Sequence, residues 1–122
     1  MILLMMRLMK VSKPIKFKNK SWGHEIWIHN SDKYCGKILV IEANKSSNLH
    51  YHKLKDETFY IQEGRILVNT ICNDGLKKEF EMKKGDVLDI PKGTKHQFTG
   101  IAEKSEIFEV STEHFDDDSI YV

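Results

Sequence analysis

The stretch Asn44–Gly64, NKSSNLHYHKLKDETFYIQEG, places two histidines at alternate positions and a glutamate shortly after them. Alternate residues of a β-strand point to the same face, so His50 and His52 share one face if residues 49–53 are extended. The charged segment 53–56 is typical of a turn, and a strand folding back after it would bring Glu57 opposite the two imidazoles. Imidazole and carboxylate groups suit divalent first-row metal ions. The stretch therefore predicts short strands that carry part of a metal site.

A second stretch, Gly85–Gly100, reads GDVLDIPKGTKHQFTG and supplies a further histidine, His96. Its glycines and its proline interrupt short β-forming runs, as expected where strands end in tight turns. His96 is remote in sequence from His50 and His52, so it must reach the site from another strand. Three nitrogen ligands and one oxygen ligand would leave coordination positions open for water or a substrate.

The rest of the chain predicts an all-β domain with little helix. Short β-forming runs alternate with turn residues, and no stretch shows a sustained apolar period of 3.6 residues. Asn73-Asp74-Gly75 is typical of a hairpin turn. Many short strands with evenly placed turns indicate a sandwich or barrel. The expected strands are 26–29, 37–42, 58–62, 65–72, 76–82, 87–90, 96–99 and 106–110, within one barrel domain over 13–122. Residues 1–12 are expected to form an N-terminal arm or an edge strand.

Composition fits an ordinary globular protein and points to no nucleic acid or membrane partner. The chain has 122 residues, of which 40% are apolar and 30% are charged, which argues against disorder. Its net charge of +1 creates no overall field that attracts nucleic acid or an anionic membrane. The apolar segment Met1–Met9 is too short to cross a bilayer and is a poor signal peptide. Cys35 and Cys72 favour free thiols in a reducing, cytoplasmic compartment, although one disulfide is an open alternative.

The two stretches together resemble the paired motifs of the cupin superfamily. They read N-x5-H-x-H-x4-E-x6-G and G-x5-P-x-G-x2-H-x3-G. The resemblance implies a double-stranded β-helix, the cupin jelly-roll barrel. It also implies one divalent transition metal ion (Zn, Mn, Fe or Ni), and the ligands are His50, His52, Glu57 and His96. Asn44 stands where the first motif usually has glycine, and Gly100 stands where the second usually has asparagine. Neither position is a ligand.

More of the chain is similar to one subgroup, the cupin domain of type II mannose-6-phosphate isomerases. The matching segments are Trp22–Trp27 (WGHEIW), Tyr34–Leu39 (YCGKIL), Asn48–Glu57 (NLHYHKLKDE) and Glu109–Thr112 (EVST). His50 stands where that group often has glutamine, and Lys55 stands where it has arginine. The resemblance implies a metal-dependent aldose–ketose isomerase that acts on a sugar or sugar phosphate.

The resemblance to the isomerases assigns roles to several further side chains. The base that moves a proton between adjacent carbons would be Glu57, or Glu109 if strand alternation points it inward. Lys55 or Lys95 would bind a phosphate, although Lys55 would equally suit a solvated turn. Phe59 and Phe98 share strand parity with Glu57 and His96, so they should line the metal pocket.

Other conspicuous residues are given ordinary structural roles. Trp22 and Trp27 are expected in the core or at a subunit contact more than on a sugar ring. The histidines at 24, 29 and 114 are expected to be ordinary surface or core residues, and Asp116–Asp118 is expected to be a solvated turn.

Three alternatives to the isomerase remain open because the cupin fold hosts many reactions. The chain could be an Fe(II)-dependent dioxygenase of a small molecule, or a non-catalytic protein that binds metal or sugar. It could also be a barrel that retains the residues but binds metal weakly. An open sheet edge needs cover, so we expect a homodimer with the N-terminal segment near the contact.

Overall fold

The structure, a computed structural model, describes residues 9–122. The expected N-terminal arm therefore lies mostly outside the described residues, and residues 9–12 belong to no strand. The elements are β1 (Lys16–Lys20), β2 (Gly23–Asn30), β3 (Cys35–Glu42), β4 (His50–His52), β5 (Glu57–Glu63), β6 (Arg65–Ile71), β7 (Lys77–Lys83), β8 (Val87–Ile90), β9 (Lys95–Gly100), β10 (Lys104–Ser111), the 3-10 turn η1 (Asp116–Asp118) and β11 (Ser119–Tyr121).

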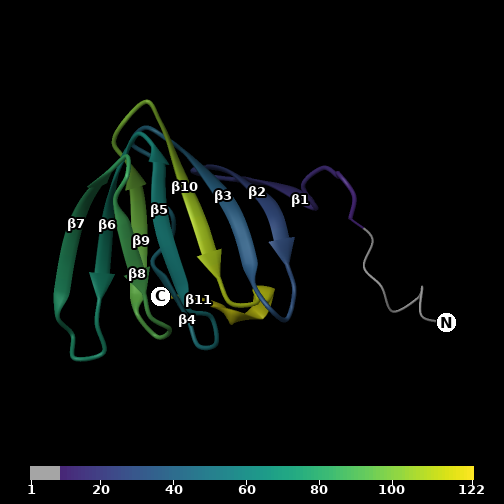
Figure 1. Ribbon diagram of the computed structural model, residues 1–122. Coiled ribbons are helices and arrows are strands. Elements are labelled where there is room, and N and C mark those ends of the chain that lie inside the picture. The colour runs from purple at the N-terminus through teal and green to yellow at the C-terminus, as the bar shows by residue number, and fades with distance from the viewer. Residues whose placement is uncertain (1–8) are drawn as a thin grey trace.

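The strands form two antiparallel sheets (Figure 1). One sheet has six strands in the order β1-β2-β3-β10-β5-β8, and the other has five in the order β11-β4-β9-β6-β7. Strands far apart in the chain become neighbours, as when β10 inserts between β3 and β5 and when β9 joins β4 to β6. Within residues 9–122 the only helical element is η1, so the expectation of an all-β fold with little helix is confirmed.

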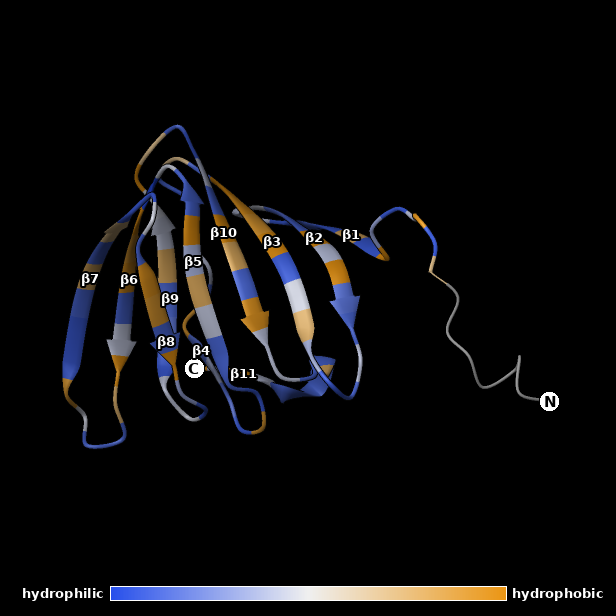
Figure 2. Ribbon diagram, viewed as in Figure 1, coloured by the Kyte–Doolittle hydropathy of each residue, from blue (hydrophilic) through white to orange (hydrophobic). Residues whose placement is uncertain are grey.

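The core lies between the sheets because alternate side chains of each strand face inward. In β6 and β10 the residues Ile66, Val68 and Ile107 are fully buried, whereas their neighbours in sequence are more exposed. Figure 2 shows both polar and apolar bands along β10, whose inward face carries Ser105 and Glu109 as well as Ile107. Each buried apolar side chain contributes about 1.5–3 kcal/mol when it leaves water. The inward positions nearest one end of the barrel are occupied by ionisable residues, and these form the site.

The expected strands are all present, and the structure adds two at the margins. β1 has the sequence KFKNK and gives little sequence signal, yet it pairs with β2 from Lys16↔Trp27 to Lys20↔Gly23. Its lysines suit an edge strand, since charged side chains discourage further pairing. β11 is short and pairs with β4, where Tyr121 lies opposite His50. β1 pairs with the strand that directly follows it, whereas the partner of β11 is remote in sequence.

The two departures from the cupin motifs have structural explanations. Asn44 has a φ of 63°, a left-handed conformation that asparagine tolerates better than most residues do. At Gly100 the backbone packs closely against β3, and a Cβ atom there would overlap the carbonyl oxygen of Glu42. The asparagine that is usual at the second position therefore does not fit this chain without a backbone shift.

Candidate metal centre

Three strands bring the predicted metal-binding residues together. β4 carries His50 and His52, and β9 carries His96 directly opposite His50. One ligand atom from each histidine lies within 4.8 Å of those of the other two. β5 begins at Glu57, whose Oε2 lies 3.0 Å from Nε2 of His52 and 3.4 Å from Nε2 of His96. The three histidines therefore form one group, and Glu57 adjoins two of them, His52 and His96.

Backbone carbonyl groups fix the orientation of all three imidazole rings. Nδ1 of His50 lies 2.8 Å from the oxygen of Asn48, and Nδ1 of His96 lies 2.9 Å from that of Thr94. Nδ1 of His52 lies 3.1 Å from the oxygen of Asp118. A carbonyl oxygen only accepts, so each Nδ1 carries the proton and donates it. In the neutral ring, Nε2 then has a free lone pair, which is the arrangement found in metal-binding histidines.

Two polar atoms at the centre of the cluster are left without a hydrogen-bond partner. Glu57 Oε2 and His96 Nε2 are buried and have no hydrogen-bond partner within the described part of the chain. Lone pairs of two imidazoles facing a carboxylate oxygen repel one another unless a cation lies between them. A divalent metal ion satisfies all of these atoms at once, so the donor set fits the expected ligand.

A metal ion would compete with a proton at His96, because burial lowers the pKa of this ring but Glu57 raises it above its usual value. The ionisation states of His50 and Glu57 suit an ion directly. Burial and the nearby His96 lower the pKa of His50 to about 4, which keeps its ring neutral near pH 7. Burial raises the pKa of Glu57, but contacts with His52 and His96 and the charge of Lys55 outweigh this effect. The net result is a pKa well below the usual range of a glutamate. A neutral imidazole and an ionised carboxylate are the forms that bind metal ions.

The cluster opens into a cavity of about 470 Å³ between the two sheets. Aromatic rings form part of its wall: Phe59 and Phe98 lie there as expected, and so do both tryptophans. Trp22 belongs to the core and packs edge-on against Phe98. The polar residues of the wall are Lys18, Lys20, Ser21, Glu25, Lys37, Ser47, Asn48, Lys55, Glu109, His114, Asp116, Ser119 and Tyr121. The cavity is thus rich in hydrogen-bonding groups and large enough for a small organic molecule.

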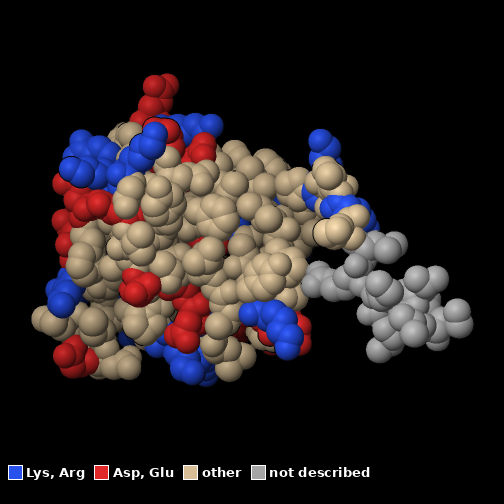
Figure 3. Space-filling view, viewed as in Figure 1, with Lys and Arg blue, Asp and Glu red and all other residues tan. Residues whose placement is uncertain are grey.

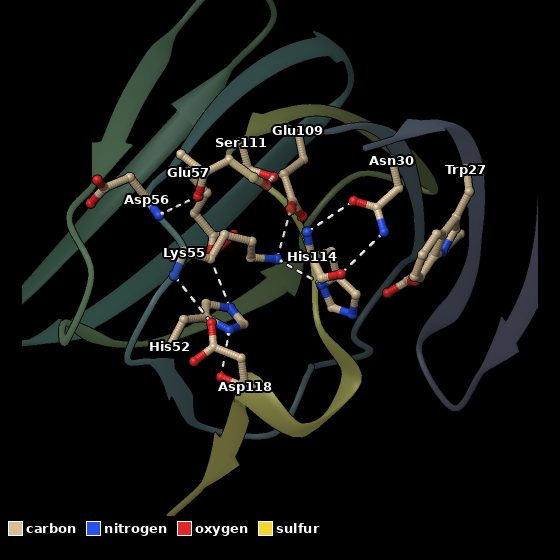
Figure 4. Close-up of polar contacts among 12 residues, drawn as sticks. Trp27, Asn30, His52, Lys55, Asp56, Glu57, Glu109, Ser111, His114 and Asp118 are labelled. Carbon is tan, nitrogen blue, oxygen red and sulfur yellow. Dashed lines mark hydrogen bonds and ion pairs between the residues drawn. The ribbon is translucent and has the colours of Figure 1, made fainter. Parts of the chain in front are cut away.

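A buried ion pair lies beside the metal cluster (Figure 4). Nζ of Lys55 donates to Oε2 of Glu109 at 3.0 Å, and both side chains are almost fully buried. Burial lowers the pKa of Lys55, but Glu109 and Glu57 raise it above its usual range, so the ammonium stays charged. The reading of Lys55 as a solvated turn lysine is therefore wrong, because its exposed fraction is 3%.

His114 continues this network, although its sequence context gave no sign of it. Its Nδ1 accepts from Lys55 Nζ at 3.2 Å, and its Nε2 donates to Asp116 at 3.1 Å. Burial, Lys37 and Lys55 lower the pKa of His114 to about 4, consistent with a neutral ring that accepts at Nδ1. His114 is therefore a cavity residue held in a fixed tautomer, and the expectation of an ordinary histidine missed this position.

Asp118 is buried, so it departs from the expected solvated turn. Its carboxylate accepts hydrogen bonds from the backbone N–H groups of Lys53, Leu54 and Lys55, at 2.8–3.2 Å. Its own carbonyl oxygen accepts from His52 (Figure 4). One residue near the C-terminus thus fixes both the candidate ligand His52 and the loop that positions Lys55.

The remaining expectations for site residues have different outcomes. Glu109 faces the cavity, as alternation suggested, and is 5% exposed. Lys95 precedes His96 on β9, so its side chain leaves the opposite face, and it does not line the cavity. Lys37 was overlooked, although its parity with Leu39 and Ile41 on β3 indicated an inward side chain. Lys37 therefore lines the cavity together with Lys18, Lys20 and Lys55, whereas Lys95 does not.

Comparison with known proteins identifies the family. A model of the cupin domain matches residues 37–110, which is more than half of the chain. The chain belongs to the cupin domain family, and the jelly-roll fold expected from its two motifs is confirmed.

The sequence is also similar to that of three curated proteins. It is 37% identical over 62 residues to an uncharacterized protein of Methanocaldococcus jannaschii, covering 51% of this chain and 46% of that protein. It is 34% identical over 59 residues to an oxalate decarboxylase of Arthroderma benhamiae, covering 48% and 14%. It is 34% identical over 67 residues to a quercetin 2,3-dioxygenase of Bacillus subtilis, covering 52% and 18%. The chain thus spans less than half the length of these relatives.

Solved structures resemble this fold at low sequence identity. A variant of oxalate decarboxylase from Bacillus subtilis has a TM-score of 0.81 at 17% identity, covering 94% of this chain and 34% of that one. The protein KdgF from Halomonas sp. has a TM-score of 0.72 at 16% identity, covering 88% and 98%. These likenesses establish the fold. Among residues 9–122, no helix has the length and apolar character needed to cross a membrane.

Proposed function

We propose that this cupin is a metal-dependent isomerase that interconverts the aldose and ketose forms of a sugar or sugar phosphate. One divalent ion (Zn, Mn, Fe or Ni) would be held by His50, His52, Glu57 and His96. The observation that carries the proposal is the cluster of three free Nε2 atoms and an ionised carboxylate beside a second, buried carboxylate, Glu109. When bound, the ion would polarise a carbonyl oxygen and make the neighbouring C–H group more acidic.

Glu109 is the residue that would move the proton between the two carbons. One of its oxygens accepts from Lys55, and no described residue donates a hydrogen bond to the other oxygen, Oε1. The buried ion pair holds the carboxylate in one orientation toward the cavity, so a bound substrate would meet a pre-positioned base. Glu57 faces the imidazole nitrogens at 3.0–3.4 Å, and its place is therefore with the metal.

The lining of the cavity supports a polyhydroxylated substrate. Indole and phenyl rings offer flat apolar faces, while lysine, carboxylate, amide and hydroxyl groups offer many hydrogen-bond partners. The similarity of four segments to the cupin domain of type II mannose-6-phosphate isomerases supports a sugar phosphate in particular. Lys55 would act here by holding Glu109, because its ammonium already pairs with that carboxylate and His114.

Deuterium exchange tests this proposal. The metal-free protein is loaded in turn with Zn²⁺, Mn²⁺, Fe²⁺ and Ni²⁺ and incubated in D₂O with a panel of aldose and ketose phosphates. We expect one metal to support ketose formation with deuterium at the adjacent carbon. Glu109→Gln should abolish the exchange while retaining metal. Absence of isomer formation with every metal and sugar would sink the isomerase, and isomer formation without deuterium would contradict a base that exchanges with solvent. Ligand-dependent stabilisation without turnover would indicate a binding protein.

A second candidate is an Fe(II)-dependent dioxygenase of a small molecule. The similarity to a quercetin 2,3-dioxygenase favours it, since that match runs over 52% of this chain. Three histidines and a carboxylate would suit iron as well as the other metals. Oxygen consumption that requires Fe²⁺ and an aromatic or thiol substrate would support this function. Sugar-phosphate turnover indifferent to oxygen would exclude it.

We also propose that the chain forms a homodimer through the outer face of its six-stranded sheet. An uninterrupted row of apolar residues crosses all six strands in register. The row consists of Phe17, Ile26, Ile38, Phe108, Tyr60 and Val87, and three of its members are 42–61% exposed. Figure 3 shows few charges over the middle of this face and many along its margins. Such a surface suits a symmetric contact with a second copy.

We place the protein in the cytoplasm. Both cysteines are free, and Cys35 is buried. Free thiols persist in a reducing compartment.

A further inference from the structure

Lys37 lies in the wall of the cavity and is one of its most deeply buried residues. It sits on β3, where its neighbours across the sheet are Trp27 on one side and Glu109 on the other. Its exposed fraction is 2%, and it shares its inward face with Leu39 and Ile41. A lysine is rarely buried to this extent without a paired charge.

No such pair exists for Lys37 within residues 9–122. Its Nζ lies 3.9 Å from the centre of the Trp27 ring and makes neither a hydrogen bond nor an ion pair with those residues. The carboxylate opposite, Glu109, already accepts from Lys55 at 3.0 Å. Glu25 accepts from the indole of Trp27 at 2.8 Å. Glu109 and Glu25 therefore act on Lys37 only through their charge, and neither is in hydrogen-bond contact with its Nζ.

The cation–π contact between Lys37 and the Trp27 ring does not make up for the water that the ammonium loses on burial. It stabilises the ammonium less than the loss of water destabilises it. Burial accordingly lowers the pKa of Lys37, and the opposing effect of Glu109 is smaller. A methionine would fill the same space without the desolvation cost, so packing alone does not account for a charged group at this position. The described residues thus leave this ammonium without an anion in contact.

We propose that Lys37 is the anchor for an anionic group, a carboxylate or a phosphate, on the molecule that occupies the cavity. An anion there would pair with Nζ, rest near the Trp27 ring and leave the rest of the molecule between Glu109 and the histidine cluster. Lys18 and Lys20 line the same cavity and would draw an anion toward it. The inference deepens the proposed function because it gives the substrate a negative charge and a fixed orientation.

Anion titration of the metal-free protein tests the anchor without any turnover. Inorganic phosphate and oxalate are added at constant ionic strength while ¹H–¹⁵N spectra follow the two indole N–H groups, assigned with Trp22→Phe. We expect a saturable shift of the Trp27 signal. Lys37→Met should weaken the binding at least tenfold, and Lys95→Met should leave it unchanged because Lys95 lies outside the cavity. The anion with the larger response distinguishes a phosphorylated ligand from a carboxylic acid.

Thermal unfolding of the same variants excludes a purely structural role. A residue kept for binding leaves the fold intact or more stable when its buried charge is removed, so Lys37→Met should match or exceed the wild-type melting temperature. A lower melting temperature, equal anion binding in Lys37→Met, or no saturable shift in the wild type would each overturn the anchor. Turnover failing while anion binding requires Lys37 would overturn the isomerase alone.

Discussion

Replacing Asp118 with alanine should reveal how strongly the C-terminal turn supports the site. The carboxylate accepts from three consecutive backbone N–H groups at 2.8–3.2 Å. A hydrogen bond to a charged group contributes about 1.5–3 kcal/mol. Lys53 and Leu54 are exposed and can return to water, whereas Lys55 is buried and cannot. We therefore expect Asp118→Ala to lower the free energy of unfolding by about 3 kcal/mol, most of it from the Lys55 N–H group.

The assay is thermal and urea unfolding of Asp118→Ala beside Asp117→Ala, whose side chain is exposed. For a chain of this size, about 3 kcal/mol corresponds to a fall in melting temperature of about 10 °C. Metal affinity should also fall by about tenfold or more, since loosening this turn disturbs the carbonyl that orients His52. If Asp118→Ala unfolds and binds metal like Asp117→Ala, the turn does not hold the site in place.

Three further changes test other parts of the account. Glu109→Gln should lower the free energy of unfolding by about 3 kcal/mol because it leaves Lys55 charged and unpaired. The double variant Glu109→Gln, Lys55→Met should recover most of this loss. Equal stability of the single and the double variant in urea unfolding would contradict the expectation. The double variant Tyr60→Lys, Val87→Lys should be a monomer by light scattering. Tyr34→Lys lies outside the apolar row and should remain a dimer. A wild-type monomer would refute the interface. Gly100→Asn, which restores the usual motif residue, should destabilise the fold by about 1–3 kcal/mol through overlap with Glu42, and an unchanged melting temperature would show that the backbone yields there.

Local patterns were sufficient to predict the fold and the cluster of candidate metal ligands. His50 and His52 could be assigned to one face because the side-chain period of a strand is two. Turn residues such as Gly85 and Pro91 separate the strands clearly enough to predict a barrel. β1 escaped prediction because its lysine-rich sequence becomes a strand only through pairing with β2.

The polar network around the cluster could not be predicted in the same way. Asp118 and His114 reach the site from a segment more than fifty residues beyond Lys55 in sequence, as their separations of 63 and 59 residues show. No local period indicates which residue of a distant turn faces inward. Lys37 differs, because its alternation with Leu39 and Ile41 marked it as an inward lysine. A charged residue at an inward position was therefore the sequence signal for the anionic partner proposed here.

The most direct test of the central claim is anomalous X-ray scattering from crystals grown with Mn²⁺, Zn²⁺, Fe²⁺ or Ni²⁺ and measured at the absorption edge of that metal. We predict one strong peak within bonding distance, about 2.0–2.3 Å, of Nε2 of His50, His52 and His96 and of a carboxylate oxygen of Glu57. The peak should vanish in His52→Ala and persist in His29→Ala, whose imidazole lies outside the cluster. A wild-type crystal without a peak between these four side chains, or with its peak elsewhere, would contradict the account.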